Sequence, residues 1–264
     1  MLDALAPARR RFVLGVGALL ALALVTVLVL TVVDRKPGVA PVAQDAQPPV
    51  LIVPGYGGST TGLGRLLDAL RAGGRTARVV DLGRTSTGDL HTQADVLDRA
   101  VRDVLGDTGA GSVDLVGYSA GGVTVRVWLA DHRGLGLTRR VVTLGSPHHG
   151  TAVAGLAADL APDSCPTACR QLAPDSDLLR DLNAQDETPA GPLWVSIWTD
   201  QDKTVVPPTS GRLTGALAFS VQSVCPDDRV SHTGLPSDPA VVATVLLELG
   251  RRAPSRPASS VCTV

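Results

Sequence analysis

Aromatic residues are scarce in this chain of 264 residues, at 3% of the composition. Because they are scarce, Leu, Val and Ala must line the core and any substrate cleft. Neither sign of charge is in excess, since 24 Lys and Arg stand against 25 Asp and Glu. This balance argues against a nucleic-acid partner. The sequence also has no internal repeat and no Gly-x-x-x-x-Gly-Lys-Ser/Thr motif, which argues against a phosphate-binding loop.

One long apolar run lies near the amino terminus. Residues 12–33 are 22 consecutive uncharged residues, and as a helix they extend about 33 Å, enough to cross a bilayer. Three arginines precede the run and two basic residues follow it. By the positive-inside tendency we expect residues 1–11 in the cytoplasm, a transmembrane signal anchor over 12–33 in the cell membrane, and the rest outside the cell. The alternative is cleavage near Ala40 or Ala43, which releases a secreted protein.

Composition divides the remainder of the chain into three parts. Residues 34–48 are rich in Pro, Ala and Gln without helical periodicity, which is typical of a semi-extended linker. We expect one catalytic domain over residues 49–253, a length that buries a sizeable core. A Pro- and Ser-rich tail, residues 254–264, follows it. We expect the protein to be a monomer.

All four cysteines lie beyond the apolar run, and an extracellular location favours disulfides there. Of the three possible pairings, we expect Cys165 with Cys169 and Cys225 with Cys262. The second bond would hold the tail on the domain. A C-x3-C pair without histidines nearby is weak evidence for zinc, so we expect no metal and no cofactor.

The stretch V-D-L-V-G-Y-S-A-G-G, residues 113–122, combines an apolar strand, a sharp turn and the start of a helix. The glycines two positions either side of Ser119 remove the Cβ atoms that would clash in so tight a turn. A serine at such a turn stands above the edge of the sheet, so Ser119 is the predicted nucleophile. The bare G-x-S-x-G pattern is common by chance, and its weight comes from the strand before it and the helix after it.

Apolar runs of strand length alternate with segments of helical periodicity. We expect strands at residues 49–54, 77–82, 113–116, 140–144, 193–198 and 217–224, and helices at 63–70, 94–105, 123–129 and 240–249. This alternation predicts an α/β fold with a mostly parallel, doubly wound sheet. In such sheets, sites form where the carboxyl ends of the strands meet the loops.

The loop after the first strand is rich in glycine, P-G-Y-G-G-S. Acyl transfer requires two N–H donors aimed at the developing oxyanion, one from this loop and one from the residue after the nucleophile. We expect these donors to be the backbone N–H groups of Tyr56 and Ala120. A purely structural glycine turn is the alternative.

An acid and a base are needed beside the nucleophile, and the chain order serine, acid, histidine suggests which residues supply them. After the strand at 193–198 come two carboxylates, and we expect Asp202 to be the acid, with Asp200 in reserve. After the last strand comes His232, the expected base, which takes the serine proton and gives it to the leaving alkoxide.

The sequence contains four other histidines that could serve as the base in place of His232. His91 and His132 lie near helix ends and are expected to be surface residues or caps. His148 and His149 follow the strand at 140–144, and either might compete for the role of base. The chain order favours His232.

Five motifs in this order, V-P-G-Y-G-G, V-D-L-V-G-Y-S-A-G-G, V-V-T-L-G-S-P-H-H-G, D-Q-D-K-T-V-V-P-P and S-H-T-G-L-P, resemble those of small bacterial lipases and esterases of the α/β-hydrolase superfamily, especially secreted actinobacterial lipases. The resemblance spans residues 49–251. It implies a minimal α/β-hydrolase fold and hydrolysis of a lipid or ester substrate through an acyl-enzyme. By the same resemblance the nucleophile, acid, base and oxyanion donors fall on Ser119, Asp202, His232, Tyr56 and Ala120. One departure is Pro54, where many relatives carry histidine.

Two questions stay open at the level of sequence. Residues 152–160 are small, apolar and helix-prone, and fit either a flap over the acyl pocket or an ordinary crossover helix. An acyltransferase with the same triad remains an alternative function, and a membrane-tethered binding protein without catalysis is a weaker one.

Overall fold

The structure is a computed structural model that describes residues 16, 19–26, 39 and 41–263. The chain divides into two compact units, Met1–Gly38 and Val39–Val264. In the first unit, Val16 and residues 19–26 are helical. No helix within the described residues combines the length and apolar character needed to span a bilayer. Most of the expected anchor at 12–33, and all of residues 1–11, lie outside the described residues.

Six strands form one sheet in the second unit. They are β1 Val50–Val53, β2 Ala77–Val79, β3 Val113–Tyr118, β4 Thr138–Leu144, β5 Leu193–Trp198 and β6 Leu217–Ser220. Their order is β2-β1-β3-β4-β5-β6, and every neighbouring pair is parallel. The chain moves outward from β1 to β2 and then back across β1 to β3, so the strand order reverses beside β1 and β3. Open α/β sheets place their ligand crevices at such a reversal, at the carboxyl ends of the strands.

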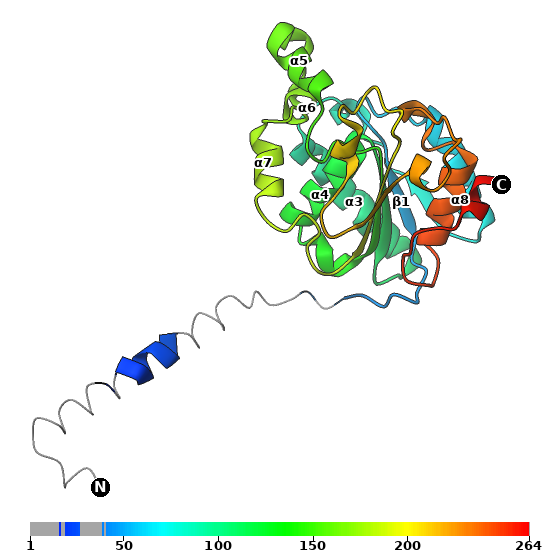
Figure 1. Cartoon of the computed structure of the whole chain (residues 1–264). Coiled ribbons are helices and arrows are strands. Elements are labelled where there is room, and N and C mark those ends of the chain that lie inside the picture. The colour runs from blue at the N-terminus through cyan, green and yellow to red at the C-terminus, as the bar shows by residue number, and fades with distance from the viewer. Residues whose placement is uncertain (1–15, 17–18, 27–38, 40, 264) are drawn as a thin grey trace, which may run out of the picture. The chain divides into compact units, whose positions relative to one another are not determined.

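Helices cover both faces of the sheet (Figure 1). They are α2 Gly64–Ala72, α3 Leu90–Thr108, α4 Ala120–Asp131, α5 Ala152–Leu160, α6 Thr167–Gln171, α7 Asp177–Asn183 and α8 Pro239–Glu248. Successive residues of β1 point to opposite faces, because side chains alternate along a strand. Leu51 and Val53 pack with α3 and α4, whereas Val50 and Ile52 pack with α2 and α8. The expected doubly wound α/β fold is therefore confirmed.

The last strand is shorter than expected. The apolar run predicts a strand to Val224, but β6 ends at Ser220 and a 3-10 turn, Val221–Ser223, follows. The Ser220 hydroxyl accepts a hydrogen bond from the Ser223 N–H at 3.2 Å, and this local bond competes with continued strand pairing. The second strand likewise stops at Val79 instead of Leu82.

Both expected disulfides are present, Cys165–Cys169 and Cys225–Cys262. The second joins residues 37 positions apart. It holds a final 3-10 turn, Ser259–Thr263, on the domain, and Val261 of that turn is buried. The carboxyl-terminal tail is thus fixed by a covalent bond and by apolar contact.

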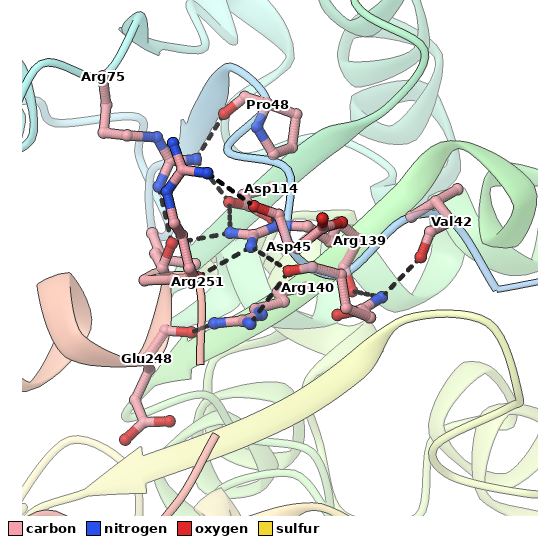
Figure 2. Close-up of polar contacts among 12 residues, drawn as sticks. Val42, Asp45, Pro48, Arg75, Asp114, Arg139, Arg140, Glu248 and Arg251 are labelled. Atoms are coloured by element: carbon pink, nitrogen blue, oxygen red, sulfur yellow. Dashed lines mark hydrogen bonds and ion pairs between the residues drawn. The ribbon is translucent and has the colours of Figure 1, made fainter. Parts of the chain in front are cut away.

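Four buried charged residues meet at the amino ends of β3 and β4, in what we call the arginine cluster: Arg75, Asp114, Arg139 and Arg140 (Figure 2). Arg139 bonds both carboxylate oxygens of Asp114, at 2.9 and 2.5 Å, and Arg75 bonds Asp114 at 2.6 Å. The arginines also donate to backbone carbonyls of residues 44, 48, 248, 249, 250 and 252. The cluster therefore ties the segment before β1 and the segment after α8 to the same end of the sheet.

Candidate active site

Ser119 occupies the turn between β3 and α4 with φ 52° and ψ −127°, a conformation that non-glycine residues rarely adopt. The turn is tight enough to require glycine on both sides. An added Cβ on Gly117 would lie 2.4 Å from the Cα of Gly122, and one on Gly121 would lie 2.2 Å from the Val53 carbonyl oxygen. The G-x-S-x-G motif therefore forms a strained strand-to-helix turn that projects the serine at the carboxyl edge of the sheet.

His232 lies between Ser119 and Asp202. Its Nε2 is 2.9 Å from the Ser119 Oγ, and its Nδ1 is 2.7 Å from Asp202 Oδ2. The other oxygen of Asp202 accepts the N–H groups of Thr204 and Val205, at 2.8 and 2.7 Å. Because the carboxylate accepts a hydrogen bond from Nδ1–H, Nε2 is left as an acceptor for the serine hydroxyl.

Asp200, the reserve acid, has different partners. It accepts the Trp198 indole N–H at 3.2 Å and the Ser220 hydroxyl at 2.9 Å. The structure therefore brings Asp202 and not Asp200 to His232. Both carboxylates lie in the loop that follows β5, which ends at Trp198.

The loop after β1 passes directly against the serine. An added Cβ on Gly55 would lie 3.0 Å from the Ser119 Cβ. Ala120 is the first residue of α4, where backbone N–H groups have no partner within the helix. Within the described part of the chain, neither the Tyr56 N–H nor the Ala120 N–H donates a hydrogen bond. Both N–H groups are therefore unpaired in this part of the chain.

Tyr118 contacts His232, a contact that the sequence analysis does not predict. Its ring centroid is 5.4 Å from that of His232 at an interplanar angle of 35°, and its hydroxyl donates to the His232 carbonyl at 3.3 Å. Burial, and secondarily the charge of Asp202, raise the pKa of Tyr118 to about 12, so the hydroxyl stays protonated. Its position next to Ser119 was the only sequence signal, and this does not identify the partner.

The other histidines have structural partners. His148 is fully buried and its Nε2 lies 3.1 Å from the Thr143 hydroxyl. Burial, with the nearby charges of Arg126 and His149, holds the pKa of His148 well below its usual value. His149 pairs with Glu187 at 2.8 Å. Neither histidine hydrogen-bonds Ser119, so neither competes with His232 for contact with the Ser119 hydroxyl.

His91 and His132 lie on the surface layer formed by α3 and α4. His91 pairs with Asp131 at 2.6 Å, and His132, the C-cap of α4, pairs with Asp95 at 3.1 Å. Their expected place at helix ends is confirmed.

A cavity of about 640 Å³ lies elsewhere, between α3, α4, α6 and α7. Its lining includes His91, Asp131, Arg170 and Asp181, and none of the residues around Ser119. Across the described ranges, no group of three or more His, Cys, Asp or Glu is arranged to hold a metal ion.

Solved structures share this fold. The chain resembles lipase B of Aspergillus fumigatus with 17% identity and a TM-score of 0.68, over 83% of this chain and 56% of that one. It resembles the mature form of the Bacillus licheniformis lipase BlEst2 with 20% identity and a TM-score of 0.63, over 81% and 95%. A gene product of Listeria innocua, lin2722, matches with 16% identity and a TM-score of 0.55, over 81% and 98%. The chain thus spans little more than half the length of the Aspergillus lipase.

Sequence comparison identifies the family. Residues 96–242, more than half of the chain, match the family described as Lipase (class 2). The match covers the strained turn at Ser119 and the loops that carry Asp202 and His232. The expected resemblance to lipases and esterases is confirmed, whereas the secreted bacterial type stays a prediction. The chain belongs to the family described as Lipase (class 2) and has the α/β-hydrolase fold.

Proposed function

We propose that Ser119, His232 and Asp202 act as a catalytic triad that hydrolyses carboxylic esters through an acyl-enzyme. The Ser119 Oγ attacks the ester carbonyl carbon while His232 Nε2 takes its proton. The tetrahedral intermediate then expels the alcohol, which receives that proton from His232. Water repeats the sequence on the acyl-enzyme: His232 takes one proton from it, the acyl–Oγ bond breaks, and Ser119 regains its proton as the carboxylic acid leaves.

Asp202 and the two backbone donors complete the proposed site. Asp202 holds the imidazole with its proton on Nδ1 and stabilises the imidazolium that forms during each half-reaction. The Tyr56 and Ala120 N–H groups stabilise the oxyanion, which in comparable sites contributes a factor of about 10² to 10³ for each donor.

The two hydrogen bonds that link Ser119 to His232 and His232 to Asp202 support this proposal most directly. Both links are at hydrogen-bonding distance, 2.9 and 2.7 Å, and they join three loops that lie far apart in the sequence. Ser119 keeps an unfavourable φ although Gly would fit there without strain. A strained serine with an oriented base is the arrangement that nucleophilic catalysis requires.

The proposed substrates are lipids or simpler esters, met outside the cytoplasm. The two disulfides form and persist in oxidising compartments, which supports an extracellular or secreted catalytic unit. Whether residues 12–33 anchor the protein stays a prediction.

Turnover of p-nitrophenyl esters from two to sixteen carbons by the full chain tests the proposal. We expect Ser119→Ala to lower kcat by a factor of about 10³ or more, and a fluorophosphonate probe to label Ser119 alone. Ser260→Ala, an exposed serine of the tail, is the matched control and should change neither result. Undiminished turnover by Ser119→Ala refutes the assignment. Products analysed in the presence of glycerol separate a hydrolase, which releases free acid, from an acyltransferase, which forms a new ester.

A further inference from the structure

Helix α5 presents an apolar face to solvent. Val153, Leu156 and Leu160 are 48%, 59% and 80% exposed, and their spacing of three and four residues places them on one side of the helix. In the described part of the catalytic unit, only Tyr56 and Leu247 are other large hydrophobic residues with comparable exposure. We call Val153, Leu156 and Leu160 the α5 stripe.

The position of α5 fits neither of the two expectations from the sequence, a crossover helix or a flap over the acyl pocket. A crossover helix would bury its apolar side chains against the sheet, but the buried residue of α5 is Ala154 alone. A flap would lie over the site, whereas Figure 1 shows α5 extending outward beyond the body of the domain. The helix packs against α6 and the 3-10 turn Pro162–Ser164.

The base of α5 is held firmly. The Thr151 hydroxyl accepts the Val206 N–H at 3.0 Å and donates to the Thr204 carbonyl at 2.7 Å, and the Ala152 N–H donates to the Val206 carbonyl at 2.8 Å. These partners belong to the loop that carries Asp202. The Cys165–Cys169 disulfide cross-links a short loop that follows the carboxyl end of α5. Fixed at its base, α5 holds its stripe at a constant place relative to the proposed acid.

The α5 stripe projects from the edge of the sheet that carries the site. Ser119, Asp202 and His232 follow β3, β5 and β6, and α5 follows β4. All these strands are parallel, so the segments that follow them leave the same edge. Tyr56, 44% exposed, follows β1 at this edge as well.

The chemistry of α5 suits a hydrocarbon surface. Asp159 is its only ionisable residue and it carries no Lys or Arg, so it offers no attraction to anionic headgroups. We propose that the α5 stripe inserts into the surface of aggregated lipid and holds the Ser119 edge against it. This inference rests on the proposed ester hydrolysis, since a water-insoluble ester is presented to the enzyme as such a surface.

A fluorescent label tests insertion without turnover. Every described cysteine is in a disulfide, so Leu156→Cys supplies one thiol for an environment-sensitive nitrobenzoxadiazole label. Leu247→Cys, on α8 and 56% exposed, is the matched control. Both are made in the full chain carrying Ser119→Ala, so that failure of the proposed hydrolysis does not affect the result. The amino-terminal apolar run is common to both proteins.

Vesicles of ether-linked phosphatidylcholine should raise the emission of the label at 156 about twofold, with a blue shift, and leave the label at 247 unchanged. An equal response of both labels, or none at 156, overturns the inference. A response at 156 that grows with protein concentration in the absence of lipid also overturns it, because the stripe then pairs two copies of the chain.

Activity supplies the second readout. The triple variant Val153→Ser, Leu156→Ser, Leu160→Ser changes exposed side chains only, so we expect it to fold. Its rate on emulsified tributyrin should fall about tenfold or more, while kcat/KM on soluble p-nitrophenyl acetate stays within about twofold of wild type. Leu247→Ser should change neither rate. Equal losses on both substrates would show that α5 supports the site and not the surface.

Discussion

Glu248 offers a quantitative test of the electrostatics around the arginine cluster. The residue ends α8, is 2% exposed, and its Oε2 has no hydrogen-bond partner within the described residues. Burial raises the pKa of Glu248 from 4.5 to about 7, against the opposing effects of a Ser255 backbone hydrogen bond and the charge of Arg140. The folded protein therefore keeps a proton on this carboxyl that the unfolded chain has already released.

The sign of the effect on stability follows from this difference. Below about pH 4.5 both states are protonated, and the free energy of unfolding is unaffected by the carboxyl. Between about pH 4.5 and 7 the unfolded chain loses its proton first, so stability falls as the pH rises. The whole difference in pKa corresponds to about 3.4 kcal/mol at most. Relaxation of the protein around a buried charge lowers the effective penalty, and we expect about 1 to 2 kcal/mol.

The substitution Glu248→Gln removes the charge and nearly preserves the shape. Urea unfolding followed by tryptophan fluorescence should show a variant more stable than wild type by about 1 to 2 kcal/mol at pH 8 and about equal to it at pH 4.5. A variant that is less stable at pH 8 would show that Arg140 stabilises an ionised Glu248, and would refute the reasoning.

Glu187→Gln serves as a control with the opposite sign. Burial raises the pKa of Glu187, but the Thr214 N–H and His149 outweigh it and hold the pKa below its usual value. The ionised form therefore stabilises the fold above the unfolded pKa and this contribution is lost as the pH falls. Glu187→Gln should lower stability at pH 8 and have little effect at acid pH.

Three further tests address the turn, the acid and the tail. Asp202→Asn should lower kcat by a factor of about 10³ to 10⁴, whereas Asp200→Asn should cost less than about tenfold in the same ester assay; the reverse order would make Asp200 the acid. Gly121→Ala should lower the free energy of unfolding by about 3 kcal/mol or more, because its Cβ meets backbone that cannot yield, and near wild-type stability in urea would contradict the tight turn. Reduction of the Cys225–Cys262 disulfide should cost up to about 4 kcal/mol, measured as a lowered urea midpoint, and an unchanged midpoint would show that the tail contributes nothing.

The parts of the fold that could be predicted are those that the local sequence determines. The run V-L-I-V forms β1 because it is buried on both faces and contains no residue that prefers another conformation. The end of β6 could not be predicted, because apolar residues recur as far as Val224 and the strand ends where the Ser220 hydroxyl accepts the Ser223 N–H. Position in the sequence favours Asp202 over Asp200, but the orientation of the Asp202 carboxylate towards His232 depends on the Thr204 and Val205 N–H groups that donate to it.

The arginine cluster lies beyond sequence reasoning for a different reason. Arg139 and Arg140 are adjacent near the start of β4, and arginine is rarely buried unless it has partners. Their partners are Asp114 and carbonyl groups about 95 to 112 positions away. Only the complete fold brings these groups together. Burial of any one of the charges without its partners would be costly in free energy.

The arginine cluster also determines which side of the catalytic unit faces a surface or a fusion partner to which it is attached. One nitrogen of Arg139 holds the carbonyls of both Gln44 and Gly250, at 2.9 Å each, so the chain enters and leaves the sheet at a single spot. Asp114 is the second residue of β3 and Ser119 follows its last residue, so the two lie about 17 Å apart along the strand axis. A linker, fusion partner or surface attached before β1 is therefore joined to the domain at the amino ends of the strands. The opposite edge of the sheet, which carries Ser119 and the α5 stripe, then faces away from the attachment.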